Sequence, residues 1–524
     1  MLTDFKQIEP NTELNADICV VGGGAAGISI ARELIDEDCS VLLLESGGKS
    51  FDPEIQRLYE GVNSRDDFAL DSSRLRYFGG STNHWGGWCA PFDEIDFVKR
   101  DWVPNSGWPI TYDVLAPYYR RAQQVCGLGD YRYDVAEWPS QNLAALRLDP
   151  EKLEHKMWQI SPPTIFGRVY EKELTMATNL KVILNATVTQ VVTDANGSTV
   201  TAVSLADLHG RRATVRAAFF VIACGGIESP RLLLASNHVH SAGIGNKHDL
   251  VGRFFMEHPH PDAGGILLTG DAELLRAYSV REVEGERIVT GFGPSPAAQQ
   301  RLRILNSSIV LSGPLRHGPS EGWDSLTKLS RSRQSGEWPE GMGSHVAKVL
   351  RDLDDVLAES YRRATEGAIK GFQLVGRTEL VPNRENRLTL AYERDALDVN
   401  RIRLDWKVGS LDRSTVATTM KLLAEELGRL NVARVRVNEL LFKDDSSWSE
   451  NLSWFGHHMG TTRMDANPKR GVVDTDCRVH GVSNLFIASG SVFPTCSFAN
   501  PTLTIVAIAL RLADHLKTKV SSGV

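Results

Sequence analysis

Two kinds of hydrophobic pattern alternate along the chain and predict its elements. Residues 18–21 and 41–44 are continuous apolar runs, which are typical of strands buried on both faces of a parallel sheet. A helix is predicted between them, from about Ala25. Residues 219–236 (FFVIACGGIESPRLLLAS) predict another buried strand, followed by a helix that starts near Ser229 and Pro230. This second strand is expected to join the first sheet.

Polar and apolar residues alternate in other segments and predict antiparallel strands. Residues 182–194 and 197–207 alternate on either side of Asn196-Gly197, as in a β-hairpin. Residues 371–380, 386–393 and 402–408 alternate as well, and they predict strands of a second sheet. Residues 499–517 predict a buried helix that is apolar nearly all round, with Asn500 as its cap and Pro501 at its first position.

The segment 313–371 differs from its surroundings. Its first half is rich in Gly, Ser, Pro and charges and predicts a loop, and residues 346–365 predict an amphipathic helix. A lid, an oligomer contact and a solvated surface excursion all fit this composition.

Composition excludes some classes of function. The chain has 524 residues and a formal net charge of −7, without the basic face that a nucleic-acid-binding protein needs. No apolar run approaches the roughly 18 residues that span a bilayer. The first residues show no secretory signal, and the seven cysteines lack metal-binding spacing. We therefore expect a cytoplasmic protein without a metal site.

Three glycines follow the first predicted strand with dinucleotide-binding spacing. Gly22 permits the tight turn, Gly24 the approach of a pyrophosphate, and Gly27 the packing of helix on strand. Glu45 ends the next strand, where a carboxylate accepts from ribose hydroxyls. The motif predicts a dinucleotide site without separating FAD from NAD. A nucleotide domain built from distant segments is typical of flavoproteins.

Longer motifs carry a resemblance to a known family. They include YFGGSTNHWGG (77–87), LVGRFFMEHPH (250–260), HHMGTTRM (457–464) and FANPTLT (498–504). In these the chain resembles the glucose–methanol–choline oxidoreductases, nearly end to end, and most of all the branch of pyranose oxidase and bacterial glycoside 3-oxidases.

The resemblance implies an α/β fold with two parts. One is a Rossmann-like FAD-binding domain of the p-hydroxybenzoate hydroxylase type, and the other a substrate domain with a mostly antiparallel sheet flanked by helices. The FAD-binding domain is expected to comprise residues 1–110, 180–260 and 452–524. The substrate domain is expected to comprise residues 111–179 and 261–451.

The resemblance also implies a reaction. Without the resemblance, the adjacent histidines His457 and His458 would be interpreted as structural residues that pack or hydrogen-bond in the core. In the family a histidine at the position of His457 takes the hydroxyl proton of an alcohol, for which its pKa is suited. Asn500 is expected to hydrogen-bond the same hydroxyl, while His458 stays structural.

The expected substrate is a sugar or glycoside, oxidised at a secondary ring hydroxyl such as C3 or C2. A primary or aryl alcohol, a non-catalytic flavoprotein subunit and an NAD dehydrogenase are the alternatives. The electron acceptor is expected to be oxygen or a quinone or cytochrome.

The expected cofactor is FAD, bound without a covalent bond or joined through His84. Its predicted ligands lie in the glycine turn, at the end of the next strand, in the loop before residue 87, in the hairpin, in the segment 219–236 and in the C-terminal segments. They are Gly22, Gly24, Ala25, Ala26, Gly27, Glu45, Ser46, Gly80, Ser81, Asn83, His84, Trp85, Val188, Ala223, Gly490, Ser491, Pro501 and Thr502. Cys89 is expected to be a buried, inert thiol.

Overall fold

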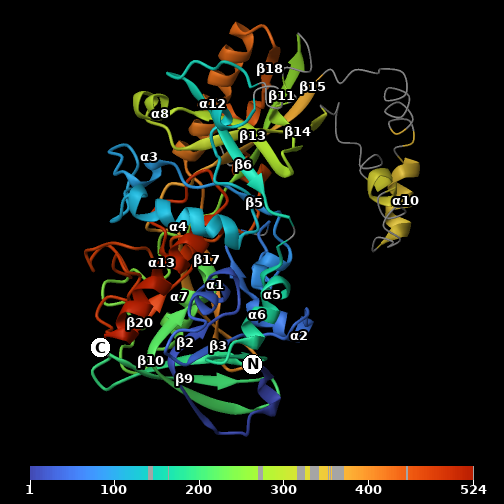
Figure 1. Cartoon of the computed structure of the whole chain (residues 1–524). Helices are drawn as coiled ribbons and strands as arrows, with labels where there is room; N and C mark the ends of the chain where they lie inside the picture. Colours follow the sequence, from blue (N-terminus) through green and yellow to red (C-terminus); the bar gives the residue numbers. More distant parts are fainter. Residues whose placement is uncertain are drawn as a thin grey trace.

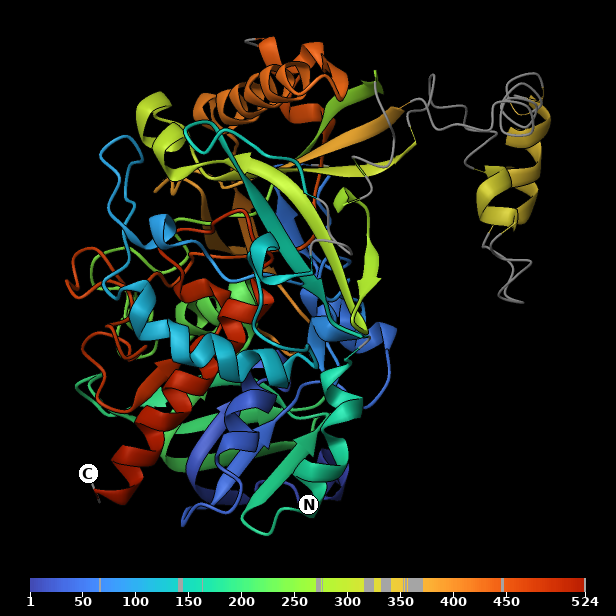
Figure 2. The ribbon, with the colours of Figure 1, turned by 45° about the horizontal axis from the view of Figure 1, so that its top comes forward.

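A computed structural model shows two large sheets at opposite ends of the molecule, with helices between and around them (Figures 1 and 2). It describes residues 1–65, 67–139, 145–162, 164–269, 275, 277–314, 325–330, 341–351, 353, 356, 371–443 and 447–522. No helix in this described part of the chain is long and apolar enough to cross a membrane.

The first sheet is mostly parallel and has eight strands. Its order is β1 (Leu2–Asp4), β7 (Leu180–Leu184), β3 (Val41–Leu44), β2 (Glu13–Val21), β10 (Arg212–Ile222), β9 (Val200–Ala206) and β8 (Thr187–Thr193), and β20 (Leu485–Ile487) pairs with β10. Helix α1 (Ala25–Glu33) connects β2 to β3, which is the predicted strand–helix–strand unit. Strands β8 and β9 form the predicted hairpin.

The second sheet has nine strands, and their pairings are antiparallel. Its order is β18 (Ala433–Val437), β11 (His260–Leu268), β15 (Gly371–Thr378), β14 (Ser307–Pro314), β13 (Glu286–Pro294), β6 (Leu153–Ile160) and β5 (Trp88–Cys89), with β12 (Arg281–Val283) on β13 and β19 (Leu452–Ser453) on β11. Helix α12 (Ser410–Arg429) packs against this sheet. The predicted α/β class with a parallel and an antiparallel sheet is confirmed.

Two predicted strands lie elsewhere. β16 (Arg387–Arg394) and β17 (Asn400–Asp405) form a three-stranded sheet with β4 (Gly61–Asn63) and pack against α7 (Gly225–Ala235). Their prediction as part of the second sheet is wrong, because an alternating pattern shows that one face is buried but not which element covers it. The predicted start of α7 near Ser229 is also wrong, since the helix begins at Gly225 and holds Pro230 inside it.

Two longer helices lie between the sheets. α13 (Thr502–Ser521) packs against α1 and α4 (Tyr112–Val125). The shorter helices are α2 (Pro53–Gln56), α3 (Glu94–Phe97), α5 (Phe166–Val169), α6 (Glu171–Met176) and α8 (Pro296–Leu302). Where the division into two domains falls along the chain stays a prediction.

Helix α10 (Met342–Arg351) stands apart from both large sheets in Figures 1 and 2. It includes the start of the amphipathic helix predicted for residues 346–365. Most of the predicted excursion at 313–371 falls outside the described residues.

Candidate active site

The glycine turn leaves open space beside the start of α1. A Cβ on Gly22 would meet Ala223 O at 2.6 Å, and one on Gly27 would meet Gly22 O at 1.9 Å, so both positions pack tightly. A Cβ on Gly24 would meet no atom within 4 Å. The free amide groups at the helix start, from Ala25 and Ala26, therefore have room for a pyrophosphate beside them.

The acid that ends β3 lies directly beside this turn. Glu45 is buried and accepts hydrogen bonds from the amides of Gly23, at 2.8 Å, and Gly47, at 2.9 Å. Burial raises the pKa of Glu45. Ser46, the next residue, shares a 2.7 Å hydrogen bond with Thr187, which precedes Val188 in β8. The predicted cofactor residues Glu45, Ser46 and Val188 thus lie close together, where β3 ends and β8 begins.

The loop at residues 79–87 contacts the turn through its backbone. The amide of Gly79 donates to Gly23 O at 2.8 Å, and a Cβ on Gly80 would lie 3.1 Å from the Cα of Gly24. The Asn83 side chain donates to Phe78 O and Gly80 O, at 3.1 and 2.8 Å, so its amide nitrogen holds the loop together.

Three other predicted residues sit in or beside the short 3-10 helix of this loop. Ser81 and His84 are exposed, and the ring of Trp85 packs edge-on against Phe166. Cys89, at the following strand, is buried, and burial raises the pKa of its thiol.

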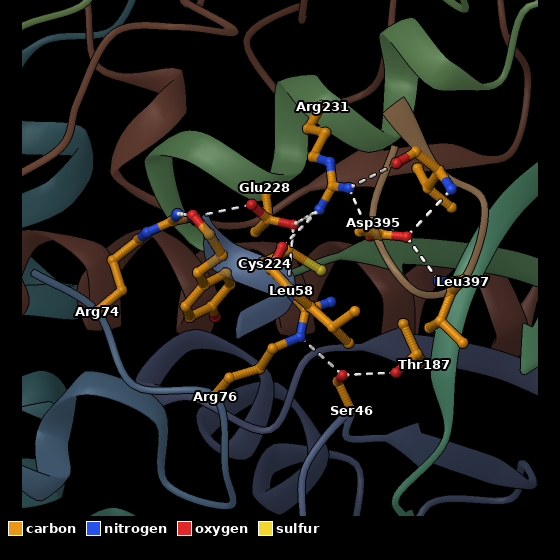
Figure 3. A network of polar contacts seen from close by, with 12 residues as sticks. Ser46, Leu58, Arg74, Arg76, Thr187, Cys224, Glu228, Arg231, Asp395 and Leu397 are labelled. Carbon is orange, nitrogen blue, oxygen red and sulfur yellow. Dashed lines mark hydrogen bonds and ion pairs between the residues drawn. The ribbon is translucent and has the colours of Figure 1, made fainter. Parts of the chain in front are cut away.

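A buried charge network anchors the chain just before this loop (Figure 3). Glu228 of α7 pairs with Arg74, Arg76 and Arg231, at 2.9, 3.2 and 3.0 Å. Burial alone would raise the pKa of Glu228, but the three guanidinium groups hold it far below its usual range. Arg76 also donates to Ser46 Oγ at 2.8 Å. The network therefore links α7, the loop and the end of β3.

The two C-terminal motifs meet through backbone hydrogen bonds. Gly460 N donates to Gly490 O at 3.1 Å, and Thr462 N donates to Ser491 O at 2.8 Å. Helix α13 begins at Thr502, after Pro501, and no side chain caps it. The prediction that Asn500 caps this helix is wrong, because its side chain turns to two partners in the site instead.

Those partners are His457 and Arg377. Asn500 Oδ1 accepts from Arg377 Nη1 at 3.0 Å, and Asn500 Nδ2 lies 3.3 Å from His457 Nε2. Because the oxygen of the amide faces the guanidinium, its nitrogen is the group that faces the imidazole. The structure thus brings the predicted histidine and asparagine together.

Hydrogen bonds behind His457 fix where its proton lies. His258 Nε2 is 3.0 Å from both Cys496 O and Ser497 O, so this nitrogen carries a hydrogen and donates. Burial lowers the pKa of His258 to about 4, so the ring is neutral and its Nδ1 accepts. The 2.9 Å contact with His457 Nδ1 is then donated by His457. His457 Nε2 therefore carries no hydrogen, and its lone pair accepts from Asn500 Nδ2 at 3.3 Å.

Comparison with known proteins identifies the class of the chain. Two family models described as GMC oxidoreductase match it, one over residues 171–260 and one over residues 382–509. The chain belongs to the GMC oxidoreductases. It is an enzyme that binds FAD and oxidises alcohols.

Two relatives and one solved structure match the chain at low identity. The fructose dehydrogenase large subunit of Gluconobacter japonicus is 24% identical over 98% of this chain and 100% of its own length. The C-glycoside 3-oxidase of Microbacterium trichothecenolyticum is 25% identical over 60% of this chain and 49% of its own. The structure of formate oxidase has a TM-score of 0.57 at 17% identity and covers 98% of this chain and 100% of its own. This last likeness shows the fold alone.

The second histidine of the pair has a different environment in this GMC oxidoreductase. His458 is buried, stacks on Phe255 and meets the ring of Phe68 edge-on. Its Nε2 lies 3.8 Å from Glu257 Oε2, and neither atom has a hydrogen bond to a described residue. Burial raises the pKa of Glu257 to about 8 and lowers that of His458, so both groups are neutral at pH 7.

Sequence reasoning missed three residues that contact His457 and Asn500. Glu257 Oε1 accepts from the amide of His457 at 2.8 Å, His258 orients its ring, and Arg377 holds Asn500. Glu257 and His258 lie in the MEHPH stretch (256–260), where an acid next to a histidine could have indicated functional residues. Nothing in the alternating pattern around Arg377 distinguishes it.

Proposed function

We propose that this enzyme oxidises a secondary ring hydroxyl of a sugar or glycoside, at C3 or C2, with His457 as the base and Asn500 as its partner. The unprotonated Nε2 of His457, which lies 3.3 Å from the Asn500 amide nitrogen, is the observation that supports these roles. Relatives whose names specify fructose and a C-glycoside support the substrate class.

In the proposed reaction a substrate hydroxyl lies between the imidazole and the amide. His457 Nε2 removes the hydroxyl proton, and Asn500 Nδ2 donates a hydrogen bond to the same oxygen while the carbonyl forms. Bound FAD supplies the acceptor for the hydrogen that leaves the adjacent carbon as hydride. His258 keeps the His457 proton on Nδ1, so that the reactive nitrogen stays free.

The start of α13 is placed to serve the same reaction. With no side-chain cap, the first amide groups of the helix, at Thr502 and the two residues after it, have no intrahelical acceptor. They form the positive end of a 20-residue helix, which favours negative charge beside it. We propose that these amides face the polar edge of the flavin and that His84 packs over its ring without a covalent bond.

The decisive experiment measures flavin reduction in the absence of oxygen. A panel of free sugars, glycosides and benzylic alcohols is mixed with the purified enzyme, and loss of the oxidised flavin absorbance is followed. The proposal expects reduction by a sugar or glycoside. Reduction by benzylic alcohols alone would show that the substrate is not a sugar or glycoside. It would not contradict the proposed roles of His457 and Asn500.

The base is tested with His457→Ala. We expect the variant to keep FAD and to lose about 10²-fold or more in reduction rate, the usual contribution of general base catalysis. His458→Phe is the control, since it removes a neighbouring imidazole that does not face Asn500. Near-normal reduction by His457→Ala would overturn the assignment. Reoxidation by air against a quinone then identifies the electron acceptor.

A further inference from the structure

A positive charge without a counter-charge lies beside the catalytic pair. Arg377 is half-buried, its Nη1 donates to the neutral amide of Asn500, and its Nε is buried without an acceptor in the described part of the chain. No described carboxylate is within ion-pair distance of this guanidinium. Burial lowers the pKa of Arg377 only to about 10, so the group is charged at neutral pH.

Two buried arginines elsewhere in the protein are paired, whereas buried Arg463, like Arg377, has no ion pair with a described carboxylate. Arg100 forms a two-bond pair with Glu379, at 2.8 and 2.6 Å, and Arg231 pairs with Asp395 at 2.6 Å. A desolvated charge is costly unless an opposite charge compensates it. Arg377 lacks such a charge among the described residues and contacts Asn500, the neighbour of His457, so a molecule that enters this site can supply the opposite charge.

The surroundings of Arg377 hold it in place without neutralising it. Its guanidinium carbon lies 4.3 Å from the ring centre of Trp88 and 5.4 Å from that of Trp158. These aromatic faces attract a cation but supply no acceptor for its N–H groups. Burial lowers the pKa values of His258, His260 and His457, and the charge of Arg377 lowers all three further.

The geometry of the guanidinium specifies the kind of partner. Asn500 uses Nη1, which leaves Nε and Nη2 along one edge with no hydrogen bond to a described residue. Two parallel donors along one edge match the two oxygens of a carboxylate. We propose that Arg377 binds a carboxylate of the substrate, so that the enzyme oxidises a hydroxylated acid such as a sugar acid. The sugar part of this proposal rests on the proposed function, and the carboxylate part does not.

Matched pairs of alcohols test the proposal in the unmodified holoenzyme. D-Glucuronate is compared with D-glucose, and 4-(hydroxymethyl)benzoate with benzyl alcohol, by anaerobic flavin reduction. A hydrogen-bonded charge pair predicts a preference for the acid of about 10-fold or more in kcat/KM in whichever pair is oxidised. Equal values for acid and neutral alcohol would overturn the proposal. If only the aromatic pair were oxidised, the sugar or glycoside proposal would fail. The ratio of kcat/KM for 4-(hydroxymethyl)benzoate and benzyl alcohol would still test whether Arg377 binds a carboxylate.

A binding measurement separates recognition from turnover. Acetate and acetamide are titrated into the oxidised holoenzyme, and the flavin absorbance change is recorded. We expect acetate to bind at least about 10-fold more tightly than acetamide, and Arg377→Gln to abolish the difference. Arg377→Lys should retain part of it, since lysine keeps the charge and loses the fork.

Arg463→Gln is the matched control. Arg463 is a buried arginine that stacks on Phe254, 4.7 Å from its ring centre, and donates to the backbone of Asn105. Its removal should leave the acid preference unchanged. If Arg377→Gln slowed neutral and acidic alcohols equally, the charge would serve the catalytic pair or the reduced cofactor instead, and the proposal would fail.

Discussion

His258→Gln and His258→Asn separate the hydrogen bonds at the two nitrogens of His258, the residue that orients the proposed base His457. His258 Nε2 donates to Cys496 O and Ser497 O at 3.0 Å each, and its Nδ1 accepts from His457 Nδ1 at 2.9 Å. The amide of an asparagine ends near the position of Nδ1, and that of a glutamine near Nε2. Each variant therefore keeps one end of the relay.

The glutamine variant leaves the Nδ1 hydrogen of His457 without an acceptor. A buried donor left unpaired costs about 1–3 kcal/mol. If the whole cost falls on the reactive tautomer, the reduction rate falls about 5- to 150-fold, because 1.36 kcal/mol is a factor of ten. The asparagine variant keeps the acceptor but leaves the two carbonyls unpaired, so its unfolding free energy falls by about 1–3 kcal/mol.

The assay is anaerobic stopped-flow reduction of the flavin, with thermal unfolding measured on the same samples. The expected order of rates is wild type, then asparagine, then glutamine, while the glutamine variant is the more stable of the two. A glutamine variant that reduces as fast as the wild type would show that His258 does not set the tautomer of His457. The same conclusion would follow if the asparagine variant were the slower one.

Three carboxylates outside the proposed catalytic pair give further predictions. Glu228→Ala leaves the arginines of its network without their shared partner, so we expect a loss of about 3–5 kcal/mol in unfolding free energy and a lower ratio of flavin to protein absorbance after purification. Glu379→Ala leaves Arg100 as a lone buried charge, and a similar loss should appear in thermal unfolding with no change in flavin spectrum. Glu257 has a pKa raised from 4.5 to about 8, so its protonated form stabilises the fold below pH 4.5 and this contribution is lost as the pH rises to about 8. Between pH 4.5 and 8 the unfolding free energy of Glu257→Gln should therefore fall less than that of the wild type. If the two plots of unfolding free energy against pH were parallel, the raised pKa of Glu257 would be refuted.

The elements around the predicted nucleotide site could be predicted because their signals are local. The predicted bounds of β3 (Val41–Leu44) and the predicted start of α1 at Ala25 agree with the structure. An apolar run, a glycine turn and a helix lie within a short stretch of chain there, so the sequence pattern locates each of them. The hairpin of β8 and β9 follows from its turn residues in the same way. Each of these elements is specified by its own neighbours in sequence.

Pairing between distant segments was not predictable in the same manner. β16 and β17 have the alternation of sheet strands, yet they pair with β4 from the start of the chain rather than with the second sheet. Asn500 has every local feature of a helix cap, but its side chain bonds Arg377, which lies far from it in sequence. Local pattern fixes the type of an element, while the partner of a polar side chain depends on the tertiary fold.

The same distinction explains how the catalytic pair is held. His457 and His458 are placed by backbone packing: a Cβ on Gly226 would lie 2.2 Å from His458 O, and one on Gly460 would lie 2.2 Å from Phe254 O. Met256 and Met459 form a bridge that aligns the MEHPH stretch with the pair of histidines. The segments around residues 226, 254–256 and 457–460 thus meet through their backbones, and hydrogen bonds with His258 and Asn500 orient the ring of His457. If His457 is the base, as proposed, its orienting hydrogen bonds are formed before a substrate arrives, which is the condition under which positioning contributes to rate.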